Sequence, residues 1–146
     1  MKAIVTLLAL PVITIAATVS LSFDTVYDNP DGDMGSITCS DGENGMITAG
    51  FSQFDDLPNF PNIGGAPAIT EWNSPSCGTC WKLTYTSSKG VSSSSNILAI
   101  DVGSRGFNIA KAAMNTLTNG QAEQLGRVNV DAVQVAPSDC GLQISV

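Results

Sequence analysis

The chain has 146 residues, with thirteen acidic and six basic side chains, a formal net charge of −7 and no histidine. An acidic surface repels phosphate backbones and anionic headgroups, so we expect neither nucleic acid nor a membrane surface as a partner. The lack of histidine excludes the Ser-His-Asp and Cys-His catalytic arrangements and most catalytic zinc sites.

The first 18 residues have the features of a secretory signal peptide. Lys2 supplies the positive charge, residues 3–15 are mostly apolar, and small residues follow at positions 16–18. The apolar stretch is too short for a membrane-spanning helix, and no later segment reaches the required length. We expect cleavage near Thr18, which leaves one domain, residues 19–146. We expect that domain to be secreted to the extracellular space or the cell wall, without membrane insertion.

The first half of the domain is predicted to be extended and rich in loops. Residues 19–23 alternate between apolar and polar side chains, as a half-buried strand does. Residues 28–33 form an acidic segment whose spacing is similar to a calcium loop, but no glutamate stands where it would close the coordination shell. We interpret this segment as a solvated turn and expect no metal. Residues 55–68 hold three prolines and two adjacent glycines, which predicts an ordered surface loop.

The second half contains the clearest strands. Residues 81–86 alternate cleanly, residues 87–95 are a polar hairpin or loop, and residues 96–102 are apolar on both faces, which is typical of a central strand. Residues 128–135 alternate again and predict the last strand.

One convincing helix is predicted to begin near Asn108, a candidate N-cap, and to end at Gly120. Its apolar face would consist of Ile109, Ala112, Ala113 and Leu117. Residues 121–125 favour a second short helical turn that ends at Gly126. Many short strands with one or two short helices predict a single-domain, mainly β protein built as a closed β-barrel.

The chain has four cysteines: Cys39, Cys77, Cys80 and Cys140. The Cys-x-x-Cys pair lacks the strand–helix context of a redox motif, and a zinc site would need two more ligands at close spacing. An even number of cysteines in an exported protein favours two structural disulfides. Of three possible connectivities we favour Cys39–Cys77 with Cys80–Cys140. Each of these bonds closes a loop of tens of residues, whereas Cys77–Cys80 would constrain only four residues.

Asp101 is the most interesting carboxylate. It ends the apolar strand 96–102 and opens a glycine-rich turn, a place where binding and catalytic groups are often displayed. The alternative is a structural role, in which Asp101 caps the turn or pairs with Arg105. Hydrolysis of a glycoside normally needs a second carboxylate. The candidates are Asp24, Glu71 and Asp131, and no spacing singles one of them out; the adjacent Asp55 and Asp56 are interpreted as a solvated loop tip.

Aromatic side chains could stack on sugar rings. The candidates are Tyr27, Phe51, Phe60, Trp72, Trp81 and Tyr85. In a small barrel such side chains more often belong to the core.

The segment Trp72–Lys82 and the cysteine spacing closely resemble the cerato-platanin family of small secreted fungal proteins. The similarity spans the domain, through Val19-Ser20, Met34-Gly35-Ser36, Phe60-Pro61-Asn62-Ile63-Gly64-Gly65, Gly106-Phe107-Asn108 and Gly126-Arg127-Val128. The resemblance implies a six-stranded double-ψ β-barrel, related to expansin and barwin domains. It also implies disulfides that join the first cysteine to the second and the third to the fourth.

The resemblance further implies a function. Family members bind N-acetylglucosamine oligomers of the chitin type, loosen cellulosic material without marked hydrolysis, elicit plant defence and self-assemble at hydrophobic interfaces. Asp101 matches an acid similar to the catalytic aspartate of expansins and endoglucanases, while Gly106 and Asn108 match positions in a shallow sugar groove. At residues 101–106 the chain departs from the family, which more often has a serine and a shifted arginine there.

We therefore expect a non-enzymatic carbohydrate-binding protein that needs no cofactor. Its expected binding residues are Asp101, Gly103, Arg105, Gly106 and Asn108. Its expected partners are chitin or N-acetylglucosamine oligomers, cellulosic polysaccharide and a plant receptor. The alternatives are a weak glycosidase that uses Asp101 as its acid, and a defence-eliciting interaction protein that does not need sugar.

Overall fold

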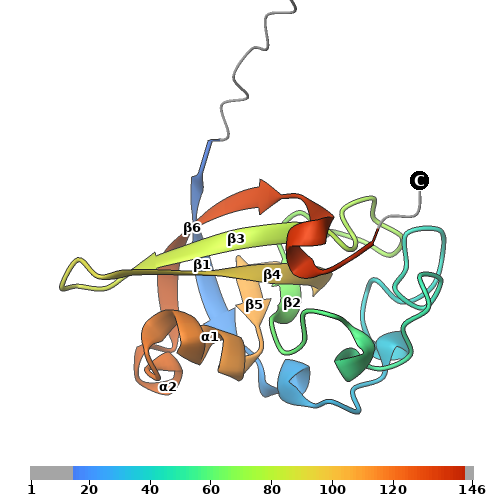
Figure 1. Ribbon diagram of the computed structural model, residues 1–146, viewed down its shortest axis with the longest axis horizontal. Coiled ribbons are helices and arrows are strands. Elements are labelled where there is room, and N and C mark those ends of the chain that lie inside the picture. The colour runs from blue at the N-terminus through green and yellow to red at the C-terminus, as the bar shows by residue number, and fades with distance from the viewer. Residues whose placement is uncertain (1–14, 144–146) are drawn as a thin grey trace, which may run out of the picture.

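The computed structural model describes residues 15–143, which form a closed barrel of six strands (Figure 1). The strands are β1 (Ala17–Phe23), β2 (Ile63–Ala66), β3 (Cys80–Thr86), β4 (Ser92–Val102), β5 (Phe107–Ile109) and β6 (Arg127–Val135). Their order around the barrel is β1-β5-β2-β4-β3-β6, and β6 returns to β1. The pairs β1–β5 and β2–β4 are parallel and all others antiparallel. This is the expected six-stranded double-ψ β-barrel.

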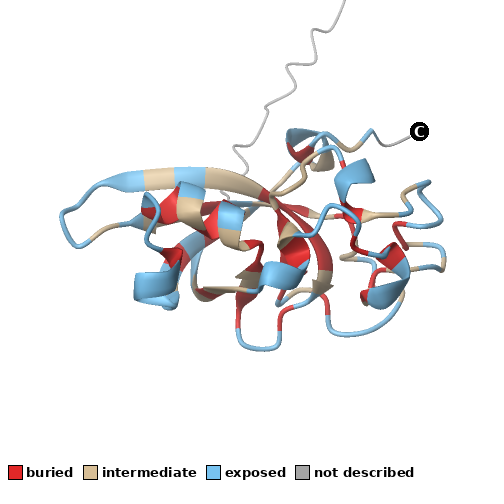
Figure 2. Cartoon of the chain, turned by 90° about the horizontal axis from the view of Figure 1, so that it is seen from below, coloured by how far each residue is buried: buried red, intermediate tan, exposed pale blue. Residues whose placement is uncertain are grey.

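The predicted strands at residues 19–23, 81–86, 96–102 and 128–135 are confirmed as parts of β1, β3, β4 and β6. Residues Ile97 to Ile100 are all fully buried, as expected for a strand with two apolar faces. β4 begins earlier than predicted, at Ser92, because Ser92 to Ser95 pair with residues 83–86 of β3. The resulting β3–β4 hairpin projects from the barrel, and its tip is exposed (Figures 1 and 2).

The prediction that residues 55–68 form only a surface loop is wrong. Ile63–Ala66 is the fully buried strand β2, which lies between β4 and β5. Its glycines are what allow this position. A Cβ on Gly64 would lie 2.3 Å from the carbonyl oxygen of Asn108, and a Cβ on Gly65 would lie 2.3 Å from that of Val102. The sequence has the composition of a loop, but pairing with β4 and β5 makes this segment a strand in which all four residues are buried.

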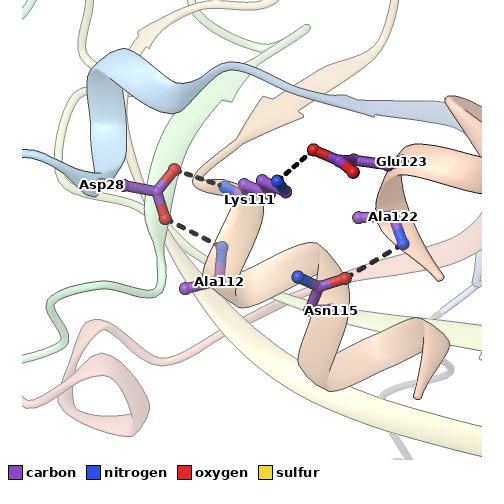
Figure 3. A network of polar contacts seen from close by, with 6 residues as sticks. All are labelled: Asp28, Lys111, Ala112, Asn115, Ala122 and Glu123. Carbon is purple, nitrogen blue, oxygen red and sulfur yellow. Dashed lines mark hydrogen bonds and ion pairs between the residues drawn. The ribbon is translucent and has the colours of Figure 1, made fainter. Parts of the chain in front are cut away.

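The predicted start of the helix at Asn108 is also wrong. Phe107–Ile109 is strand β5, and helix α1 (Lys111–Thr118) begins after it. The residue at the N-cap position is Ala110, which has no side-chain acceptor, and Asp28 takes over this role from a distant 3-10 helix. Its two carboxylate oxygens accept hydrogen bonds of 2.8 Å from the backbone nitrogens of Lys111 and Ala112 (Figure 3). Ala112, predicted to be buried, is exposed.

α1 ends at Thr118, two residues before the predicted stop at Gly120, and the second short helix is as predicted. Asn119 adopts the left-handed conformation directly after α1, and α2 (Ala122–Leu125) ends at Gly126. The side-chain oxygen of Asn115 accepts a hydrogen bond from the backbone nitrogen of Ala122, and Lys111 forms an ion pair with Glu123 (Figure 3). These contacts fix the two helices to each other beside the barrel.

The favoured disulfide pairing is confirmed: Cys39 is bonded to Cys77, and Cys80 is bonded to Cys140. The first bond ties the long segment between β1 and β2 to the segment before β3. The second bond ties β3 to the 3-10 helix Pro137–Cys140. The segment between β1 and β2 contributes buried side chains of its own, including Met34, Met46 and Phe54, so the core extends beyond the barrel.

Residues 1–14 of the expected signal peptide and residues 144–146 lie outside the described residues. Within residues 15–143, no helix is long and apolar enough to cross a membrane.

Candidate functional site

The turn between β4 and β5 holds most of the expected binding residues. The backbone nitrogen of Gly103 donates to the carbonyl oxygen of Ala66, and that of Gly106 donates to the carbonyl oxygen of Gly103. Gly106 has φ of +119°, and a Cβ there would lie 2.2 Å from the carbonyl oxygen of Ser20. Glycine is therefore required at position 106, where the turn lies directly against β1.

This turn forms one wall of an open cavity of about 150 Å³. The cavity is lined by Ser22, Val102, Gly103, Ser104, Arg105, Gly106, Asn108 and Arg127. Four of the five expected binding residues, all except Asp101, thus lie around one cavity. Two larger cavities, of about 540 and 730 Å³, contain none of the five.

The sequence did not predict four of the lining residues: Val102 and Ser104 in the turn itself, and Ser22 and Arg127 on other strands. Ser22 on β1 is aligned with Asn108 of β5 on one side and with Arg127 of β6 on the other. The hydroxyl of Ser22 donates a 3.1 Å hydrogen bond to the side-chain oxygen of Asn108. Nη1 of Arg127 donates to Oγ of Ser20 at 2.7 Å and to the carbonyl oxygen of Arg105 at 3.3 Å. Arg127 therefore connects β6 to β1 and to the turn.

Asp101 does not line the cavity, and its carboxylate is engaged elsewhere. Oδ1 accepts hydrogen bonds from the backbone nitrogens of Thr38 (3.0 Å) and Val102 (2.8 Å), and Oδ2 accepts one from the hydroxyl of Tyr27 (3.0 Å). An ionised carboxylate offers about four acceptor positions, so three are filled. In the described residues Asp101 forms no ion pair with Arg105. The carboxylate ties the end of β4 to the segment between β1 and β2.

Tyr27 is buried. Within residues 15–143, Asp101 is the one hydrogen-bond partner of its hydroxyl group. Burial raises the pKa of the Tyr27 hydroxyl far above its usual value, and the negative charge of Asp101 adds to this effect. Both effects disfavour the deprotonated form of Tyr27, because burial removes the water that would solvate its charge and Asp101 is already negative. Tyr27 is thus a hydrogen-bond donor over the whole physiological range.

None of the candidate second acids lies at the cavity. Asp24 accepts a hydrogen bond from the backbone of Val26, and Asp131 accepts one from Thr18. Asp56 accepts bonds from the backbone nitrogens of Ser52 and Gln53, which lower the pKa of its carboxyl group. Glycoside hydrolysis needs two carboxyl groups that face one scissile bond. Among residues 15–143 the cavity lining contains no carboxylate.

Most of the candidate aromatic side chains belong to the core or pack against it, as expected. Trp72 is the exception, because its side chain is 58% exposed while its indole nitrogen donates to a carboxylate oxygen of Asp41 at 2.7 Å. In the described part of the chain, no three His, Cys, Asp or Glu side chains are grouped so that they could hold a metal ion.

The comparison with known proteins settles the family. The family model described as Cerato-platanin matches residues 19–142, which is almost all of the described chain. The chain belongs to the cerato-platanin family. The "Heat-stable 19 kDa antigen" of Coccidioides posadasii is 48% identical over 129 residues, which cover 88% of this chain and 85% of the antigen.

Solved structures confirm the fold of this cerato-platanin family member. Cerato-platanin 2 from M. perniciosa is 46% identical, with a TM-score of 0.82 over 86% of this chain and all of that chain. A protein described as the fungal elicitor Cerato-Platanin is 43% identical, with a TM-score of 0.72 over 84% of this chain and 96% of that chain.

Proposed function

We propose that this protein is secreted, binds N-acetylglucosamine oligomers of the chitin type, loosens cellulosic wall material without hydrolysing it, and elicits plant defence. The supporting observation is that Gly103, Arg105, Gly106 and Asn108 surround one open cavity. The cavity lies on a barrel similar to that of a protein described as a fungal elicitor. Hydroxyl, amide and backbone groups at its wall match the hydrogen-bonding groups of a sugar. The two disulfides fit an oxidising, extracellular compartment.

Asp101 acts in this proposal as a positioning residue. Its hydrogen bond to the backbone nitrogen of Val102 fixes the point at which β4 enters the turn. The sugar itself would contact the turn and Asn108. Exposed apolar side chains at Val26, Ile47 and Trp72 would serve self-assembly at hydrophobic interfaces or contact with a plant receptor.

The test is calorimetric titration of the secreted protein with N-acetylglucosamine oligomers, in parallel with an assay for released shorter sugars. We expect binding without release. Asn108→Ala should weaken binding, because its side chain lies in the cavity. Gln134→Ala is the matched control, since Gln134 is an exposed amide near the other end of β6. If wild-type protein does not bind the oligomers, the proposal is wrong.

Infiltration of plant leaves separates sugar binding from elicitation. Asn108→Ala and Gln134→Ala protein are applied at equal dose, and the defence response is measured. If Asn108→Ala loses sugar binding and still elicits the full response, elicitation does not depend on the sugar cavity. In that case the protein acts as an interaction protein.

A further inference from the structure

Both arginines of the chain lie at the same small cavity. Arg105 enters from the turn and Arg127 from the start of β6, and both line the 150 Å³ space beside Ser22 and Asn108. Without Lys2 the chain has only five basic residues against thirteen acidic ones. Two of those five therefore share one site on an otherwise acidic molecule.

Neither arginine is neutralised within the described residues. Between residues 15 and 143 the one ion pair joins Lys111 to Glu123, at the helices, and no carboxylate lines the cavity. A concave site lined by one sign of charge focuses the electrostatic field and attracts ligands of the opposite sign. The cavity is thus a locally positive site on a negatively charged surface.

Arg127 uses only one of its three guanidinium nitrogens in hydrogen bonds within the described residues. Its two recorded hydrogen bonds, to Ser20 and to the backbone of Arg105, both start from Nη1. The Nε and Nη2 donors have no partner among residues 15–143. An edge with two parallel N–H groups is the part of a guanidinium that pairs with a carboxylate through two hydrogen bonds. Because Nη1 already holds the side chain in place, little further ordering is needed when an anion binds.

The rest of the lining suits a sugar better than a small inorganic ion. Ser22, Ser104 and Asn108 supply hydroxyl and amide groups, and the side chain of Val102 is 40% exposed as an apolar contact. A phosphate or chloride ion has no apolar surface that could pack against Val102, whereas a sugar ring offers both hydroxyl groups and C–H faces. A volume of about 150 Å³ is below the roughly 300 Å³ of the smallest pockets for drug-sized ligands, so it suits one sugar unit.

We propose that this cavity prefers a carboxylated sugar, a uronic acid unit of an acidic oligosaccharide, over neutral sugar units. The carboxylate would pair with the Nε–Nη2 edge of Arg127, and Arg105 would add a second positive charge. This inference rests on the proposed function, because it assigns a ligand preference to the same sugar cavity. It also predicts that oligomers of glucosamine, which carry positive charge, bind more weakly than oligomers of N-acetylglucosamine.

The test compares ligands that differ only in whether their carboxyl groups are charged. The secreted protein is titrated with a short oligogalacturonate and with its methyl ester of equal length, which keeps the rings and removes the charge. We expect the acid to bind about 10- to 100-fold more tightly at low salt, the range of charge-assisted hydrogen bonds. The difference should shrink as salt rises. Inorganic phosphate serves as a competitor.

Variants locate the effect. Arg105→Gln and Arg127→Gln should each remove most of the preference for the acid. Lys89→Gln, which deletes the same charge at the exposed hairpin tip, should leave the preference unchanged. Arg127→Lys should recover only part of it, because lysine keeps the charge and loses the fork. Arg105→Gln keeps the test informative if Arg127→Gln is unstable, since no side-chain hydrogen bond of Arg105 is recorded among the described residues.

The outcomes separate this inference from the proposed function. If N-acetylglucosamine oligomers bind while acid and ester bind equally, the charge preference is wrong and the sugar cavity stands. If no oligomer binds, both are wrong. If phosphate at equal concentration displaces the acid completely, the cavity is a general anion site and the uronate proposal is overturned. A preference that persists in both arginine variants also overturns it.

Discussion

The hydroxyl of Tyr27 donates a 3.0 Å hydrogen bond to Oδ2 of Asp101, which joins the segment after β1 to the end of β4. The residues are 74 positions apart in sequence. With the bonds from Thr38 and Val102 to Oδ1, this contact makes Asp101 one of the points at which the turn between β4 and β5 is attached to the segment between β1 and β2. The same carboxylate that sequence reasoning assigned to sugar binding thus has a structural task.

Asp101→Ala should lower the free energy of unfolding by about 1–3 kcal/mol, because it leaves partly buried donors without an acceptor. Tyr27→Phe removes only one of the three bonds and should lower it by less. Urea denaturation of both variants measures this. Oligosaccharide affinity should fall only through displacement of the turn. If Asp101→Ala is as stable as wild type yet loses sugar binding, its carboxylate contacts the ligand directly.

Alkaline pH should destabilise the protein through Tyr27. The pKa of its hydroxyl is raised in the folded state, chiefly by burial, so this contribution to stability is complete below the usual tyrosine pKa of about 10. It is lost progressively as pH rises above that value, because only the unfolded chain releases the proton readily. Denaturation at stepped pH should show a steeper alkaline decline for wild type than for Tyr27→Phe. Equal slopes would contradict this prediction.

Asp28, at the end of the 3-10 helix Thr25–Asp28, should contribute to stability through its contact with α1. Asp28→Ala removes the acceptor for the backbone nitrogens of Lys111 and Ala112, and loss of an N-cap lowers stability by about 0.5–2 kcal/mol. Asp31→Ala is the control, since it removes the same charge three residues further along the chain, where the side chain is exposed and has no hydrogen bond among residues 15–143. Urea midpoints that fall equally for both variants would show that charge, not capping, is responsible.

Gly64→Ala should destabilise the barrel by more than about 3 kcal/mol, because its new methyl group would lie 2.3 Å from a backbone oxygen of β5 that cannot move aside. Gly90→Ala in the hairpin tip is a useful comparison. Gly90 has φ of +79° and open space around it, so the loss of stability in the Gly90→Ala variant reflects backbone strain alone. Thermal unfolding compares the two. A Gly64→Ala protein as stable as Gly90→Ala would mean that β2 can shift within the barrel.

The sequence predicted those parts of the fold whose signal is local. Alternation marks β1, β3 and β6, and a fully apolar run marks β4, because each pattern reflects the burial of its own side chains. The sequence pattern could not reveal β2, because its glycines are required by the close approach of the backbones of β4 and β5. Nor could it show that Asp28, 83 residues before Lys111, supplies the helix cap that Asn108 was expected to provide.

In the candidate site, too, the sequence predicted the residues that are close together in the chain and not those that distant strands contribute. Gly103, Arg105, Gly106 and Asn108 are close in sequence, so a single turn brings them together. Ser22 and Arg127 join them only because β5 and β6 lie on either side of β1. The one available signal for Arg127 was its place in the Gly126-Arg127-Val128 motif. That motif contributed to the family resemblance, but it did not indicate that Arg127 lines the cavity.

No hydrolysis of chitin or cellulose oligomers is expected. A second carboxylate must attack the sugar or activate water, and the lining of the cavity in the described chain provides none. Asp101 is held by three donors and does not line the cavity, so it is poorly placed as an acid. The open cavity would also leave the reacting atoms hydrated, which weakens electrostatic stabilisation of the transition state. Chromatography of oligomers after long incubation with purified protein should show no shorter products. Sustained release of such products, abolished by Asp101→Asn in a folded variant, would instead establish the glycosidase alternative.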